Sequence, residues 1–176
     1  MARSRFIERV LLVAGDPNTG KSVQMRSMFR DPRLGNSGKI PEERNLPNTY
    51  LLSPYRRLYL RLTSPHESGE SLERFLDKIE QNTDVHYRWN VASAVQIYAS
   101  NSMPSLSDLV VALDERFSPE RIRIAILSPD RHGNLLSAAP AILQALHQVS
   151  SCETMCIDAR CRQRNGLLLA DAFDFT

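Results

Sequence analysis

A glycine-rich stretch near the start of the chain carries the residues best suited to chemistry. It consists of Gly15, Asp16, Pro17, Asn18, Thr19, Gly20, Lys21 and Ser22. These residues match the pattern G-x-x-x-x-G-K-S at every fixed position, in which glycines let the backbone curl so that successive N–H groups point at phosphate oxygens. Lys21 supplies a positive charge for the β and γ phosphates, and the Ser22 hydroxyl suits Mg²⁺. The stretch therefore predicts a site for GTP or ATP with Mg²⁺.

The elements on either side of this stretch have the order that such a site requires. Residues 9–14 are an apolar run typical of a buried strand, and residues 21–29 have the pattern of a helix that ends before Asp31-Pro32. Residues 33–47 are rich in Gly and Pro and predict a mobile loop. Two short β-type segments, 50–52 and 58–63, follow and predict a hairpin around Ser53-Pro54.

The rest of the chain alternates between helical and strand-like patterns. We expect helices at 71–79, 105–117 and 135–149, strands at 91–99, 121–127 and 154–157, and a short helix at 166–173. Such alternation is typical of parallel sheets flanked by helices. The predicted fold class is α/β, as a single three-layer domain with a mostly parallel central sheet.

Composition narrows the classes of protein. The 176 residues suffice for one domain, and 42% hydrophobic with 24% charged residues is ordinary for a folded chain. With 22 Lys and Arg against 20 Asp and Glu, charge gives no nucleic-acid signal. Apolar runs are too short for a membrane span or a signal peptide, so a cytoplasmic location is expected. Cys152, Cys156 and Cys161 lack zinc-site spacing and are expected to be reduced thiols.

The glycine-rich stretch and the order of elements resemble the P-loop NTPases, and among them the GTPase-like branch. The resemblance implies a switch threonine that senses the γ phosphate and binds Mg²⁺, and Thr49 is the candidate for it. It also implies a D-x-x-G switch after the third strand, where this chain has residues 62–67 with neither the Asp nor the Gly. There Thr63 or Ser64 would hold a Mg²⁺-bound water, and His66 or Glu67 would orient the attacking water.

Base recognition in that branch uses N-K-x-D after the fifth strand, and here Asp130 alone matches. The later Asp158-Ala159-Arg160 stands where the branch has S-A-K. The resemblance thus implies a nucleoside-triphosphate-binding protein with slow hydrolysis. Its function would lie in a nucleotide-dependent interaction with a partner protein or with a second copy of the chain.

Two further patterns leave alternatives open. Residues 109–115 end in Asp114-Glu115 and resemble the Walker B strand of P-loop ATPases, although their apolar positions recur at helical spacing after Ser105, which favours a helix. A second pattern, Arg160, Arg162 and Arg164, resembles the lid arginines of P-loop kinases that act on small molecules or nucleotides. A scaffold that holds nucleotide without turning it over is the remaining hypothesis.

Overall fold

Six strands form one sheet whose central strand leads into the glycine-rich loop, residues 15–22. The computed structural model describes residues 5–35, 37–136 and 139–173. The strand order across the sheet is β2-β3-β4-β1-β5-β6, and every neighbouring pair is parallel except β2 with β3. The strands are β1 (Phe6–Ala14), β2 (Thr49–Ser53), β3 (Arg56–Arg61), β4 (Arg88–Val95), β5 (Arg121–Leu127) and β6 (Cys152–Ile157). The chain is therefore an α/β domain with a mostly parallel sheet.

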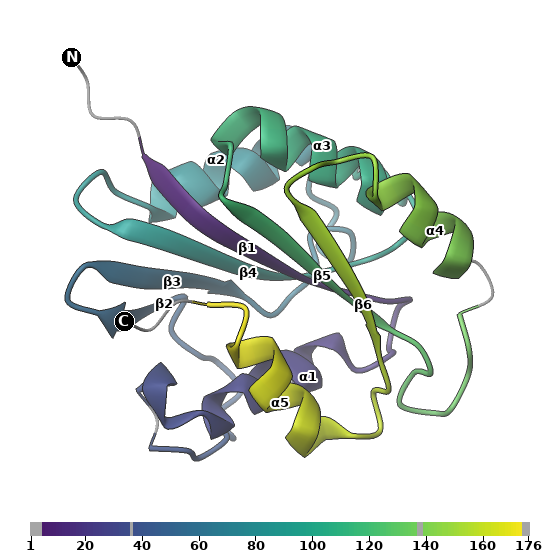
Figure 1. Ribbon diagram of the computed structural model, residues 1–176, viewed down its shortest axis with the longest axis horizontal. Helices are drawn as coiled ribbons and strands as arrows, with labels where there is room; N and C mark the ends of the chain where they lie inside the picture. Colours follow the sequence, from purple (N-terminus) through teal and green to yellow (C-terminus); the bar gives the residue numbers. More distant parts are fainter. Residues whose placement is uncertain (1–4, 36, 137–138, 174–176) are drawn as a thin grey trace.

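Helices cover both faces of this sheet (Figure 1). One face carries α2 (Leu72–Asn82), α3 (Leu106–Phe117) and α4 (Ala139–Leu146), and the other carries α1 (Lys21–Ser27) and α5 (Arg162–Ala170). Two separate apolar clusters fill the spaces between sheet and helices. Because β1 lies between two parallel neighbours and is covered on both faces, its second half is almost entirely apolar.

The connections of the strands create a crevice at the carboxyl ends of the central strands β1 and β4. Strand β1 continues into α1 on one face, whereas its neighbour β4 continues into α3 on the opposite face. In open α/β sheets, ligands bind outside the carboxyl ends of strands at such a switch point. The glycine-rich loop directly follows the carboxyl end of β1, so topology and motif single out the same place.

Most predicted elements are confirmed, with shifted ends. The predicted β2–β3 hairpin is present and turns at Pro54 and Tyr55, one residue after the predicted Ser53-Pro54, and Ser105 caps α3 by accepting a hydrogen bond from the Asp108 amide. Strand β1 begins at Phe6 rather than residue 9, and α1 ends at Ser27, followed by a 3₁₀ turn (Met28–Arg30). Another 3₁₀ turn (Pro32–Leu34) opens the predicted loop.

The largest differences lie in the second half of the chain. Strand β4 spans Arg88–Val95 rather than 91–99, and β6 begins at Cys152. Helix α4 is shorter than predicted, and residues 137–138 of the predicted helix lie outside the described part. Helix α5 begins at Arg162 rather than residue 166. The prediction missed its first turn because that turn is polar and has no apolar periodicity.

Helix α5 packs closely on α1 through a glycine. A Cβ placed on Gly166 would lie 2.1 Å from the backbone oxygen of Ser27 and 2.8 Å from its hydroxyl. A real Cβ does not approach a backbone oxygen so closely, so Gly166 sets the separation of the two helices. This contact supports the helix that follows the glycine-rich loop.

We expect Gly166→Ala to lower the free energy of unfolding by about 1–3 kcal/mol, the usual cost of overpacking a close contact. Urea denaturation of the two proteins measures this difference. The control is Gln163→Ala on the exposed side of α5, expected to change stability by less than about 0.5 kcal/mol. Equal stability of Gly166→Ala and the original chain would contradict this packing.

Candidate functional site

The glycine-rich loop has a backbone that only particular residues permit. Gly20 has a φ of 100° and Asn18 a φ of 62°, both in the left-handed region that most side chains avoid. A Cβ on Gly15 would lie 2.6 Å from the Thr19 hydroxyl, which itself donates a hydrogen bond of 2.7 Å to the Asp16 carbonyl. The Gly15 amide donates to the Val95 carbonyl at the end of β4, which joins the loop to the strand on the other side of the crevice.

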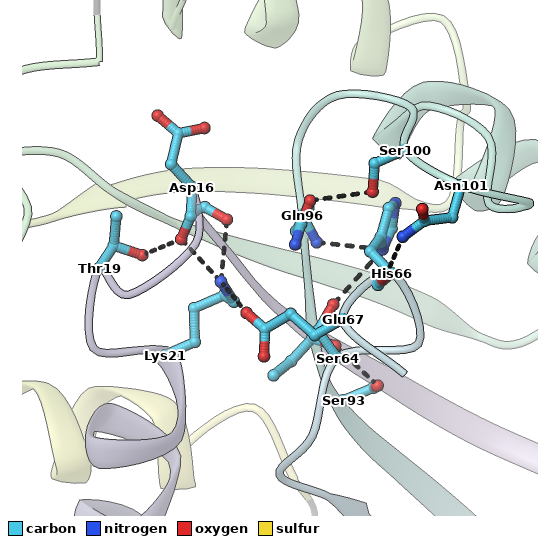
Figure 2. Close-up of polar contacts among 12 residues, drawn as sticks. Asp16, Thr19, Lys21, Ser64, His66, Glu67, Ser93, Gln96, Ser100 and Asn101 are labelled. Carbon is cyan, nitrogen blue, oxygen red and sulfur yellow. Dashed lines mark hydrogen bonds and ion pairs between the residues drawn. The ribbon is translucent and has the colours of Figure 1, made fainter. Parts of the chain in front are cut away.

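The amine of Lys21 lies inside this loop (Figure 2). It donates to the carbonyl oxygens of Gly15 at 3.1 Å and Asp16 at 2.7 Å, and it forms an ion pair with Glu67 at 3.3 Å. Only 5% of the Lys21 side chain is exposed. Burial lowers the pKa of Lys21 below its ordinary value, although the Glu67 carboxylate acts to raise it. The loop therefore holds a buried ammonium group with an acid beside it.

A cavity of about 120 Å³ opens beside the loop. Its polar lining includes Asn18, Gly20, Lys21, Ser22, Glu67 and Arg131. This volume is well below the roughly 300–1,000 Å³ of pockets that enclose whole small molecules. Its size and polar lining suit a group as small as a phosphate and do not enclose a whole nucleotide.

Two oxygen donors in this cavity suit a magnesium ion. Ser22 and Glu67 both line it, and Mg²⁺ prefers hard oxygen ligands such as hydroxyl and carboxylate groups together with phosphate and water. Among the described residues, no group of three or more His, Cys, Asp or Glu side chains is placed to hold a metal ion by itself. The donor set thus fits a metal that arrives with phosphate oxygens.

His66 and Glu67 are neighbours in sequence but have opposite surroundings. Glu67 points at the Lys21 amine, whereas the His66 side chain is fully buried away from it (Figure 2). The Gln96 amide donates to His66 Nδ1 at 3.3 Å, which leaves the proton on Nε2 to be donated to the Pro104 carbonyl at 3.1 Å. The expected role of His66 in orienting water does not fit this placement, since both ring nitrogens are occupied.

His66 instead fixes the segment that carries Glu67. Asn101 donates to the His66 carbonyl at 2.9 Å, and the Ser64 hydroxyl lies 3.4 Å from Nδ1. These contacts tie the segment after β3 to the segment after β4. Burial lowers the pKa of His66, and the neighbouring Lys21 charge acts in the same direction while Glu67 opposes it. His66 is therefore a neutral positioning residue.

Asp130 lies close to the glycine-rich loop but its carboxylate is occupied. Oδ1 accepts from the amides of His132 at 2.7 Å and Asn134 at 2.9 Å, and Oδ2 accepts from the Asn134 side chain at 3.1 Å. The similarly placed Ala159 amide donates to the Pro129 carbonyl at 2.9 Å. The Asp130 carboxylate thus closes its own turn, and the Ala159 amide joins the loop after β6 to the loop after β5.

The structure does not bring Thr49 to the glycine-rich loop. Thr49 is exposed in the edge strand β2, which lies three strands away from β1, and it pairs with Tyr59 of β3. With neighbouring strands about 4.8 Å apart, this separation alone is roughly 14 Å. A side chain of threonine cannot span it, so Thr49 does not share a metal ion with Ser22 in this conformation.

The Walker B interpretation of residues 109–115 is wrong, because these residues belong to α3. Asp114 accepts a hydrogen bond of 2.5 Å from Ser151, which directly precedes β6. It therefore lies at the amino edge of the sheet, opposite the glycine-rich loop. The helical spacing of the apolar residues correctly favoured a helix over a strand.

Arg131 is the cation at the site that the sequence did not indicate. Its amide donates to the Thr19 carbonyl at 3.4 Å, and its side chain would lie 3.5 Å from a Cβ on Gly20. The predicted lid arginines do not line this cavity: Arg160 pairs with Asp158, and Arg162 and Arg164 are exposed on α5. Nothing in the local pattern distinguishes Arg131, whose position depends on how the loop after β5 meets the loop after β1.

Comparison with known proteins adds no relative. No protein-family model, curated protein or solved structure matches this chain. Within the described ranges, no helix is both long and apolar enough to cross a membrane. The functional interpretation therefore depends on the geometry of the crevice and on the chemistry of its residues.

The buried, neutral His66 predicts a pH dependence of stability. Its pKa is lowered in the folded chain, so its contribution is complete above the unfolded value of about 6.5 and is lost as pH falls below it. The free energy of unfolding should decrease on acidification with a slope of at most ~1.4 kcal/mol per pH unit from this group. Urea denaturation between pH 7.5 and 5 measures the slope.

His66→Gln removes the titrating ring and should flatten that slope, whatever it does to stability at pH 7.5. The matched control is His132→Gln, since His132 is exposed. An unchanged slope in His66→Gln would show that His66 does not titrate differently in the folded and unfolded chain.

Proposed function

We propose that the chain is a P-loop nucleoside-triphosphate-binding protein in which the glycine-rich loop holds the phosphates, with Mg²⁺ at Ser22. The observation that carries this proposal is the buried Lys21 amine, held by loop carbonyls at the carboxyl end of the central strand. Burying an ammonium group is costly, so a position of this kind is typical of a functional site. Its placement at a topological switch point supports the same conclusion.

The nucleotide acts in this proposal as the ligand of a switch with slow hydrolysis. One side chain of the helix that follows the loop connects the phosphate site to another segment of the chain. Arg26 of α1 donates to the carbonyls of Pro41, Glu43 and Arg44, at 3.3, 2.7 and 2.9 Å. The helix at the phosphate site is therefore connected directly to the segment between α1 and β2. A partner protein that reads this segment would respond to the nucleotide.

The residues predicted to recognise the base do not select between adenine and guanine. Because the Asp130 carboxylate is engaged within its own loop and the Ala159 amide is bonded to the Pro129 carbonyl, guanine specificity has no support from them. ATP and GTP are both proposed ligands, recognised chiefly through phosphates and metal.

A scaffold that binds nucleotide without turnover is the second candidate function. It is favoured by one observation, the engagement of both ring nitrogens of His66. With His66 so held, Glu67 is the acid left beside the cavity to activate water, and it is paired with Lys21. Hydrolysis measured over hours at saturating nucleotide separates the two candidates, since a scaffold would show none above solvent background.

Titration calorimetry with ATP and GTP, each with and without Mg²⁺, tests the proposed ligand. We expect binding with Mg²⁺ and a loss of affinity of about 10- to 100-fold in Lys21→Ala, the usual worth of a hydrogen bond to a charged group. Arg162→Ala, which removes an exposed cation of α5, should bind as the original chain does. Absence of binding to every nucleotide, with the folded state confirmed by circular dichroism, would refute the proposal.

Limited trypsin digestion tests the switch. The segment between α1 and β2 contains Lys39 and Arg44, and we expect a nonhydrolysable triphosphate with Mg²⁺ to slow cleavage there several-fold. Mass spectrometry identifies the sites, and cleavage elsewhere serves as the internal reference. Arg26→Ala removes the link between helix and segment and should abolish the protection while nucleotide still binds. Equal cleavage with and without nucleotide in the original chain would exclude a switch in this segment.

A further inference from the structure

The contacts of Lys21 leave its amine no free hydrogen. An ammonium group has three N–H donors, and the three acceptors around it are the Gly15 carbonyl, the Asp16 carbonyl and the Glu67 carboxylate. A phosphate that binds to this amine must therefore replace one of them. The two carbonyls belong to the loop backbone itself, whereas Glu67 makes the longest contact and its side chain is 41% exposed. Glu67 is the partner that can give way.

The displaced carboxylate would remain close to the phosphate. The backbone at Glu67 follows directly on His66, which is fixed by its ring nitrogens and by the bond from Asn101. Rotation of the Glu67 side chain can move the carboxylate off the amine, while the fixed backbone keeps the carboxylate within a side-chain length of the cavity that Glu67 lines. A bound phosphate would then face a second anion at short range, and like charges at short range repel.

A divalent cation removes this conflict. When a phosphate ligand carries a cation, the displaced carboxylate has a positive partner again, and Ser22, whose hydroxyl suits Mg²⁺, lines the same cavity. Asp16 does not play the same part, because its carboxylate points away from the amine (Figure 2). The charged residues that line the cavity are thus the cations Lys21 and Arg131 and the anion Glu67.

We propose that Glu67 makes the site selective for metal-bound phosphate ligands, by occupying the Lys21 amine until a ligand with its own divalent cation replaces it. This inference rests on the proposed phosphate site and adds to it a residue that decides which form of the ligand binds. A metal-free polyphosphate loses the Lys21–Glu67 ion pair and gains a repulsive neighbour, whereas the magnesium complex avoids the repulsion.

The experiment compares binding of inorganic tripolyphosphate in EDTA and in excess Mg²⁺ by titration calorimetry. In the original chain we expect much weaker binding in EDTA. Glu67→Gln keeps a polar side chain that can still accept from Lys21 but has no charge, and it should tighten metal-free binding by about tenfold or more. Binding of the magnesium complex should change by less, so the ratio of the two affinities falls.

The matched control is Glu115→Gln, which removes the same charge from an exposed position of α3. It should leave the ratio unchanged, which separates a local effect from one of net charge. Thermal denaturation without ligand checks that each variant is folded. A Glu67→Gln ratio equal to that of the original chain would overturn the inference while leaving the phosphate site intact.

Failure of the phosphate site itself gives a different result. If neither the original chain nor Glu67→Gln binds tripolyphosphate in either condition, both the site and the role of Glu67 are refuted. If Glu67→Gln binds metal-free tripolyphosphate and the original chain does not, the inference is supported in its strongest form.

Discussion

The buried positive charge of Lys21 is the constraint around which the site is organised. An ammonium group removed from water requires hydrogen-bond acceptors, and here the loop backbone supplies two and Glu67 the third. The loop that directs the Gly15 and Asp16 carbonyls at the amine turns back to Lys21 through Asn18 and Gly20, both in left-handed conformations. The backbone conformation of the loop thus supplies the acceptors that allow the Lys21 amine to be buried.

The sheet topology supplies what the loop lacks. Because β1 is central, segments that follow β3 and β5 both reach the loop at the carboxyl end of β1. Glu67 comes from the segment after β3 and Arg131 from the segment after β5. Parallel strands place all these segments at the same edge, which is why residues more than 100 positions apart line one small cavity.

The segment after β3 divides two functions between adjacent residues. His66 is an internal anchor whose burial keeps it neutral, and Glu67 is the charged group that this anchor holds beside Lys21. Asp130 is likewise an internal anchor, since its carboxylate closes the turn from which Arg131 reaches the loop. In both segments a buried polar residue precedes an exposed charged neighbour. Glu67 was one of the two residues predicted in its segment, whereas Arg131 lies one residue after the predicted Asp130.

The sequence by itself determined the glycine-rich loop, the α/β class and the type of nearly every element, because these depend on local properties. Glycines at fixed spacing and the periods of 2 and 3.6 residues are visible in one stretch of chain, and the helical period of residues 109–113 correctly favoured a helix there. Only the tertiary structure decided which side chains meet at the loop. The strand order separates Thr49 from it and brings Arg131 to it, while local packing turns Glu67 toward Lys21 and His66 into the core. Strand order and the direction of a side chain at the end of a strand arise from contacts between distant segments, and no local pattern encodes them.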